Sequence, residues 1–169
     1  MQRSVPERGV ARLEGKGGRM TEPLRVRFLR LEGNPDLPLP SRATAHSAGY
    51  DVRSADPDLH LQPGEIRPVS TGLIMELPPG MECQVRPRSG LAARFGITLP
   101  NSPGTIDPDY RGELKVLLQN GGPQVVSIRR GERIAQLVFA RFETPVIDEV
   151  TAISETDRGS GGFGSTGTG

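Results

Sequence analysis

Hydrophobic and polar residues alternate along most of the chain from Leu24 onward, and this alternation predicts β-strands. In the segment LRVRFLRL, Leu24, Val26 and Phe28 fall on one side and arginines fall on the other, as expected for a strand with one covered face. The same pattern predicts further strands at 49–55, 58–62, 66–68, 70–76, 81–87, 112–119, a return strand at 125–128 after the hairpin signal Asn120-Gly121, and 132–142.

One short helix interrupts this pattern. Residues 89–96 (SGLAARFG) allow about two turns, which Ser89 would cap at the start and Gly96 would end. Elsewhere turn residues recur about every 8–12 positions, the spacing of an all-β sandwich or barrel. The segments therefore predict an all-β domain, either a barrel or a jelly-roll sandwich, with one short helix.

The two ends of the chain differ from this domain. Residues 1–20 carry charges and glycines without periodicity, and we expect them to form a disordered extension. Residues 21–150 form the predicted domain, and 151–169 form a tail. Its last twelve residues, RGSGGFGSTGTG, include six glycines and cannot build a core. They are either a disordered end or a mobile arm that orders on a ligand.

Composition narrows the classes of function. The net charge of +1 with interleaved signs argues against a protein that coats nucleic acid. No apolar run approaches the roughly 18 residues of a membrane span, so we expect no membrane partner. Cys83 is the single cysteine, which excludes an intrachain disulfide and favours a reducing compartment, the cytoplasm. Its apolar alternate neighbours predict a structural thiol.

Five segments carry polar groups at predicted turns or strand ends: AGYD at 48–51, PRSGLA at 87–92, NSPGTIDPDYRGE at 101–113, RGERIAQL at 130–137, and the glycine-rich tail. Arg88 and Ser89 at the start of the helix form either a phosphate cradle or an ordinary cap. Asp107, in a turn rich in proline and glycine, is either a general base for water or a brace of the turn. Gln136 is either a surface residue of an alternating strand or a ligand contact.

Together and in this order, the five segments resemble the motifs of the homotrimeric dUTP pyrophosphatases (dUTPases). The resemblance runs from Leu24 to the end of the chain. It implies a distorted jelly-roll β-barrel, a homotrimer with shared active sites, and a flexible glycine-rich C-terminal arm. It also implies hydrolysis of dUTP to dUMP and pyrophosphate with Mg²⁺, which limits uracil incorporation into DNA and supplies dUMP for dTMP synthesis.

The resemblance assigns roles to residues of the third segment. Asp107 matches the general base that directs water at the α-phosphorus, and Tyr110 matches the ring that excludes a 2′-hydroxyl. Asn101 matches a uracil contact. The other substrate contacts that it implies here are the neighbouring Gly104, Thr105 and Ile106, and Lys115 near the pocket.

The remaining segments match the phosphate site and the arm. The implied phosphate contacts, contributed by a neighbouring subunit, are Arg88, Ser89, Gly90 and Gln136. The implied arm contacts are Arg158, Phe163, Gly164, Ser165 and Thr166, with Arg158 pairing the terminal phosphate and Phe163 stacking on uracil. Magnesium would be held by the triphosphate oxygens without direct protein ligands, and Asp51 would reach it only through water.

Three alternatives remain at this stage. A dCTP deaminase shares the fold but needs a glutamate about seven residues after the aromatic residue, where this chain has Leu117. A non-catalytic nucleotide-binding module and a generic all-β binding domain are the other two.

Overall fold

The structure, a computed structural model, describes residues 24–162, which form eleven strands and one helix. The strands are β1 Arg27–Arg30, β2 Ser41–Arg42, β3 Tyr50–Arg53, β4 Leu59–Leu61, β5 Ile66–Glu76, β6 Met81–Arg86, β7 Ile97–Thr98, β8 Gly104–Ile106, β9 Glu113–Asn120, β10 Val126–Ile128 and β11 Arg133–Arg141, and the helix is α1 Ser89–Phe95. The all-β prediction with one short helix is confirmed. The predicted extension at 1–20 and the last part of the predicted arm, 163–169, lie outside the described residues.

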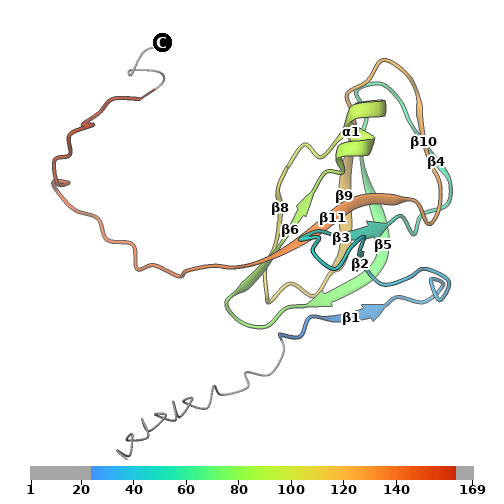
Figure 1. The fold of residues 1–169 in the computed structure, drawn as a ribbon, viewed down its shortest axis with the longest axis horizontal. Helices are drawn as coiled ribbons and strands as arrows, with labels where there is room; N and C mark the ends of the chain where they lie inside the picture. The colour runs from blue at the N-terminus through green and yellow to red at the C-terminus, as the bar shows by residue number, and fades with distance from the viewer. Residues whose placement is uncertain (1–23, 163–169) are drawn as a thin grey trace, which may run out of the picture.

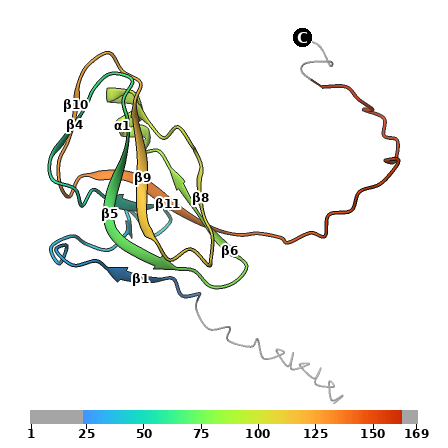
Figure 2. The ribbon, with the colours of Figure 1, turned by 180° about the vertical axis from the view of Figure 1, so that it is seen from behind.

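The strands pair antiparallel in three sheets. Their orders are β1-β5-β9-β7, β2-β3-β11-β6-β8 and β10-β4. A closed barrel gives every strand two partners. In the described part of the chain, β1, β7, β2, β8, β4 and β10 each pair with one strand only, so the sheets are open. The expected barrel is therefore not closed. Figures 1 and 2, which view the molecule from opposite sides, show the sheets wrapped around a common interior.

Branched aliphatic side chains fill that interior. On β9, Leu114, Val116 and Leu118 are at most 1% exposed, and they alternate with more accessible residues as the period of two predicts. Cys83 on β6 is fully buried. Burial, reinforced by the charge of Glu82, raises the pKa of its thiol to about 12. The thiol is thus protonated at neutral pH and serves packing, as predicted.

The predicted hairpin at Asn120-Gly121 is wrong. β10 pairs with β4 in the two-stranded sheet, and β9 pairs with β5 and β7. Asn120 is fully buried, and its Nδ2 donates to the carbonyls of Leu61 and Gln124 at 2.9 and 2.7 Å. The Gly122 amide donates to its Oδ1 at 2.9 Å. These bonds satisfy the polar atoms of the buried carboxamide. They also fix the turn after which the chain enters a different sheet.

The helix matches its predicted span but not its predicted cap. Arg88 is the N-cap residue, with extended backbone and no side-chain cap bond, and Ser89 is already helical. Gly96 ends the helix in the left-handed region at φ +69°, as predicted. A Cβ there would also lie 2.8 Å from the backbone nitrogen of Gly122, so this position requires glycine for two reasons.

Several short pairings escaped the sequence patterns. The predicted segments 66–68 and 70–76 form the single strand β5, whose pairing with β9 shifts between Ser70 and Ile74. β2, β7 and β8 were not predicted. The strand β8 matters for the site. It lies within residues 101–113, which were predicted to be only a rigid turn, and it pairs with β6. After β11 the chain runs away from the body without regular structure (Figure 1).

Candidate active site

The ends of three neighbouring strands bring the first, second and fourth sequence segments together. Gln136 on β11 lies opposite Asp51 of β3 on one side and Arg86 of β6 on the other. The chain then passes from β6 into α1. The result is an open cleft of about 430 Å³, whose lining includes Asp51, Arg88, Ser89, Gly90, Arg133 and Gln136.

Asp51 is held between two guanidinium groups in this cleft. Its Oδ1 accepts from Nε of Arg88 at 2.9 Å, and its Oδ2 accepts from Nη1 of Arg133 at 2.8 Å. Arg88 also donates to the backbone oxygen of Arg133 at 3.1 Å. Two cationic groups on one carboxylate leave a net positive charge facing the cleft, and their remaining donors suit an oxyanion such as phosphate.

Arg133 was not predicted from the sequence as a site residue. It stands in the quoted segment RGERIAQL, but 19 of the 21 basic residues in this chain are arginine, so one more arginine carried little information. The signal that would have found it is the unpaired Asp51 in a strand, which calls for a cation on the neighbouring strand.

Gln136 and the start of α1 complete the cleft. Gln136 donates from Nε2 to the carbonyl of Pro87 at 3.0 Å, which ties β11 to the turn before the helix. A Cβ at Gly49 would lie 3.1 Å from Cδ of Gln136 and closer still to its amide oxygen, so glycine there makes room for the carboxamide. Ser89 and Gly90 are exposed at the first turn, where helical amides lack intrahelical acceptors.

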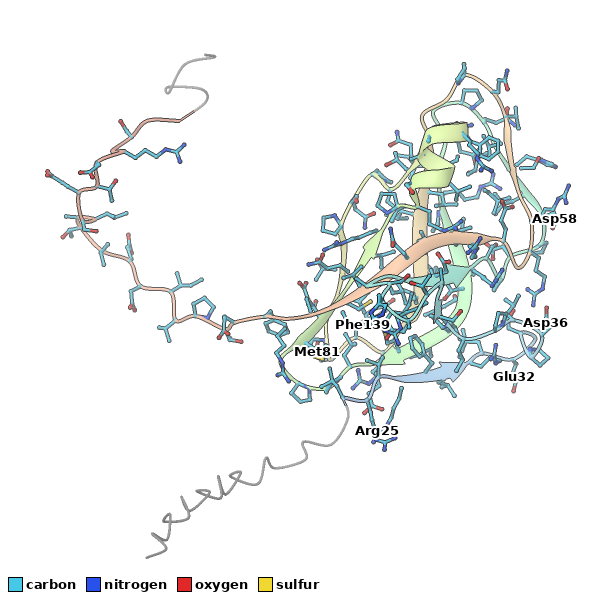
Figure 3. The ribbon with its side chains drawn as sticks, viewed as in Figure 1. Arg25, Glu32, Asp36, Asp58, Met81 and Phe139 are labelled. Atoms are coloured by element: carbon cyan, nitrogen blue, oxygen red, sulfur yellow. The ribbon has the colours of Figure 1, made fainter. Side chains whose placement is uncertain are left out.

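Another arginine of the fourth segment has a structural role. The backbone N–H of Arg130 donates to Asp58 at 2.9 Å, and its guanidinium donates to Asp36 at 2.9 Å and to Asn34 at 3.0 Å. Figure 3 shows Asp36 and Asp58 on the same side of the body. The bond from Arg130 lowers the pKa of Asp36. Arg130 thus fastens the loop before β2 and does not line the cleft.

The third segment, residues 101–113, lies apart from this cleft on the other edge of β6, where its strand β8 pairs with β6. Asp107 directly follows β8, its side chain is exposed, and no hydrogen bond reaches its carboxylate from residues 24–162. Backbone and arginine contacts close the turn: the Tyr110 amide donates to the backbone oxygen of Asp107 at 3.2 Å, and Arg111 donates from Nη1 to the carbonyls of Pro108 and Tyr110 at 2.7 and 2.9 Å. The bracing role considered for Asp107 is therefore filled by Arg111, and the carboxylate is left for solvent or a ligand.

The other predicted residues of the third segment lie around β8. A Cβ at Gly104 would approach Nδ2 of Asn101 to 3.1 Å, so the amide of Asn101 rests close to the strand. Thr105 and Ile106 pair with β6. Lys115 is exposed on β9, and its Nζ is 3.6 Å from a carboxylate oxygen of Glu113.

The predicted site residues fall into three groups on one chain. The cleft lining includes no residue of the third segment, 101–113. In the arm, Nε of Arg158 donates to the carbonyl of Gly161 at 2.9 Å, and the segment extends away from both groups (Figure 3). Phe163, Gly164, Ser165 and Thr166 lie outside the described residues.

The described part of the chain also contains a cavity apart from this site. This larger cavity of about 650 Å³ between α1 and 122–128 is lined by none of the predicted site residues. Across residues 24–162, no three His, Cys, Asp or Glu side chains gather as a metal site. In the same part of the chain, α1 falls short of the length and apolar character that crossing a membrane requires.

Comparison with known proteins bears on this arrangement. The family model dUTPase matches residues 36–167. The deoxyuridine 5′-triphosphate nucleotidohydrolase of Anaplasma marginale is 53% identical over 146 residues, covering 86% of this chain and 99% of that protein. The protein of the same name from Brucella melitensis biotype 2 is 57% identical over 144 residues, covering 83% and 92%.

A solved structure agrees with these sequences. The dUTPase of Staphylococcus bacteriophage 80alpha, solved with dUPNHPP, superposes with a TM-score of 0.76 at 27% identity, over 85% of this chain and 99% of that one. The resemblance carried by the five segments is confirmed, and the chain belongs to the dUTPase family.

Proposed function

We propose that this dUTPase cleaves dUTP to dUMP and pyrophosphate by means of a water molecule that Asp107 directs at the α-phosphorus. The observation that carries the proposal is the exposed carboxylate of Asp107, without a protein partner among the described residues and mounted on a turn that Arg111 closes. An ionised carboxylate can accept the proton of an attacking water, while the pyrophosphate departs in line with the attack.

The charged cleft is the phosphate site of this proposal. Arg88 and Arg133, fixed by Asp51, present spare N–H donors, and Ser89 and Gly90 add amides at the first turn of α1. Gln136 contributes its amide from β11. These donors are placed before the substrate arrives, so they stabilise charge on the phosphate oxygens without further rearrangement.

The third segment, residues 101–113, would select the base and the sugar. Asn101 and the backbone of Gly104, Thr105 and Ile106 offer polar groups for the uracil edge. A mismatched base would leave such groups unpaired, at a cost of about 1–3 kcal/mol each. The ring of Tyr110 would stand where a 2′-hydroxyl would otherwise lie, and thereby reject UTP by collision. Lys115 lies on β9, just after this segment.

Magnesium fits the cleft as a partner of the substrate. Mg²⁺ prefers oxygen ligands and usually keeps several waters while binding substrate phosphates. Both oxygens of Asp51 already accept from guanidinium groups, yet an ionised carboxylate retains further lone pairs. Asp51 would therefore accept from a metal-bound water and would not be a direct ligand. The ion would supply neutralising charge to the triphosphate.

The division of the site into three groups supports a homotrimer with shared active sites. The third segment, the phosphate cleft and the arm would each come from a different chain, and residues 151–169 would act as the arm that covers the substrate. Val146, Ile147 and Ile153 are 85%, 91% and 86% exposed on the segment leading to that arm, and apolar side chains so exposed favour a neighbouring subunit. The single buried Cys83 supports a reducing compartment, and we place the enzyme in the cytoplasm.

Sedimentation tests the assembly. We expect analytical ultracentrifugation to give three times the mass of one chain over the concentration range in which the enzyme is active. In such a trimer, a complete active site would combine the phosphate cleft of one chain with Asp107 of another. A monomer that retains full specific activity at high dilution would exclude shared active sites.

A substrate panel tests the reaction. Pyrophosphate release is expected from dUTP in the presence of Mg²⁺ and to fall strongly when the ion is chelated, because the triphosphate charge is then less neutralised. Release from UTP, dCTP and dTTP is expected to be much slower. Ammonia release from dCTP would instead support the deaminase alternative, which Leu117, a half-buried aliphatic residue opposite Pro68, does not favour.

A further inference from the structure

The ring of Tyr110 lies folded over the residue two positions further along the chain. Its hydroxyl donates to the backbone oxygen of Glu113 at 3.0 Å. A Cβ at Gly112 would lie 2.6 Å from Cζ and 2.9 Å from Cε2 of the ring, with the hydroxyl oxygen closer still. Real Cβ atoms do not come so close to other atoms, so the observed ring position is compatible only with glycine at 112.

The oxygen that accepts from Tyr110 is itself held firmly. Glu113 begins β9 and pairs with Ile74 of β5. Its side chain accepts from the amide of Gly72 at 3.0 Å, at the irregularity in β5 where Gly72 has φ +67°. The same carboxylate is 3.6 Å from Nζ of Lys115. The backbone and the side chain of Glu113 are therefore both tied to the four-stranded sheet.

We propose that Gly112 and Glu113 are positioning residues for sugar selection, acting through Tyr110. This inference rests on the proposed function, in which the ring of Tyr110 excludes a 2′-hydroxyl. A ring that is 44% exposed could swing aside and admit a ribose. The absence of a side chain at Gly112 leaves room for the ring, and the carbonyl of Glu113 accepts a hydrogen bond that holds the Tyr110 hydroxyl in this position. The ring is then fixed in position, and steric exclusion of a 2′-hydroxyl requires a ring that cannot move aside.

The substitution Gly112→Ala should separate selection from folding. The atoms that the new Cβ meets belong to the far end of a side chain, which can rotate away while the backbone stays in place. We expect normal trimer and melting behaviour. The ratio of kcat/KM for dUTP to that for UTP should fall at least about tenfold, the low end of what a pocket contact discriminates.

A double-mutant cycle makes the assignment specific. Gly112→Ala is measured alone and in a Tyr110→Ala background, with Tyr110→Phe as a second variant that removes only the bond to Glu113. If Gly112 acts through the ring, Gly112→Ala lowers the ratio in the parent enzyme and has no further effect once the ring is gone. Tyr110→Phe should lower the ratio to an intermediate value. Glu113→Ala should lower the ratio too, and Glu113→Gln, which keeps an acceptor for Gly72, should restore it.

The outcomes distinguish the proposed role of Tyr110 from the positioning roles of Gly112 and Glu113. If Tyr110→Ala leaves the ratio unchanged, the proposed role of the ring is wrong and the inference falls with it. If Tyr110→Ala relaxes selection but Gly112→Ala and Tyr110→Phe do not, the role of the ring stands and the positioning inference is overturned. An equal loss of ratio from Gly112→Ala in both backgrounds would also overturn it.

Discussion

Asp107→Asn is expected to bind dUTP as the parent enzyme does and to turn it over about 10²–10⁴-fold more slowly, the contribution typical of a positioned general base. An amide of the same shape cannot accept the proton of the attacking water. The carboxylate of Asp107 is exposed and accepts no hydrogen bond from the described residues, so its replacement removes no contact within the chain. We therefore expect the same melting temperature.

The neighbouring Asp109 supplies a matched control. It lies in the same turn, is also exposed, and loses the same charge in Asp109→Asn. Steady-state pyrophosphate release gives kcat, and titration with a non-hydrolysable dUTP analogue gives Kd. Parent-like turnover in Asp107→Asn would remove this residue from the proposed mechanism. An equal loss in both variants would mean that the charge of the turn matters and not the placement of one base.

Deleting residues 158–169 is expected to lower kcat strongly while the remaining protein melts normally. An arginine supplied to a transferring phosphate contributes about 10³–10⁵ in rate in nucleotide hydrolases, and Arg158 would be lost with the arm. Closure over the substrate, which excludes water, would be lost as well. The described contacts of Arg158 lie within the arm itself, so the deletion leaves the sheets intact.

Mixing variants tests whether the arm acts on another chain. Chains with Asp107→Asn and chains without residues 158–169 are each expected to be nearly inactive. Unfolding and refolding them together should restore part of the activity, because some sites in mixed trimers combine an intact base with an intact arm. No recovery, despite mixed trimers by mass, would place the base and the arm of each site on the same chain. Phe163→Ala should give part of the loss seen on deletion.

The strands were the most predictable part of the fold. Alternation alone located β5, β6, β9 and β11, because a sheet with one buried face imposes a period of two on the sequence. Pairing was less predictable. Asn-Gly favours a two-residue turn, but Asn120 instead fills a buried position with three hydrogen bonds, and such long-range partners leave no local pattern. β8 escaped because Gly104 and the prolines around it signal a turn.

The site was predictable as residue types but not as an arrangement. The motif resemblance selected Arg88, Gln136 and Asp51, which the structure brings to one cleft. Arg133 was missed because its importance comes from a partner 82 positions away in the sequence. The third segment is separate from the cleft because its strand β8 and the cleft strand β11 pair with opposite edges of β6, which no local pattern encodes.

The Asn120-Gly121 step at the end of β9 also bears on the chemical lifetime of the chain. In mobile peptides, Asn-Gly is prone to deamidation, in which the glycine nitrogen attacks the asparagine carboxamide and ammonia leaves. Here the Gly121 nitrogen donates to the carbonyl of Gly96 at 3.0 Å, and the carboxamide of Asn120 is fixed by its own three bonds. The attack therefore requires the loop to open first, so isoaspartate can form at this position only as fast as the native structure locally unfolds.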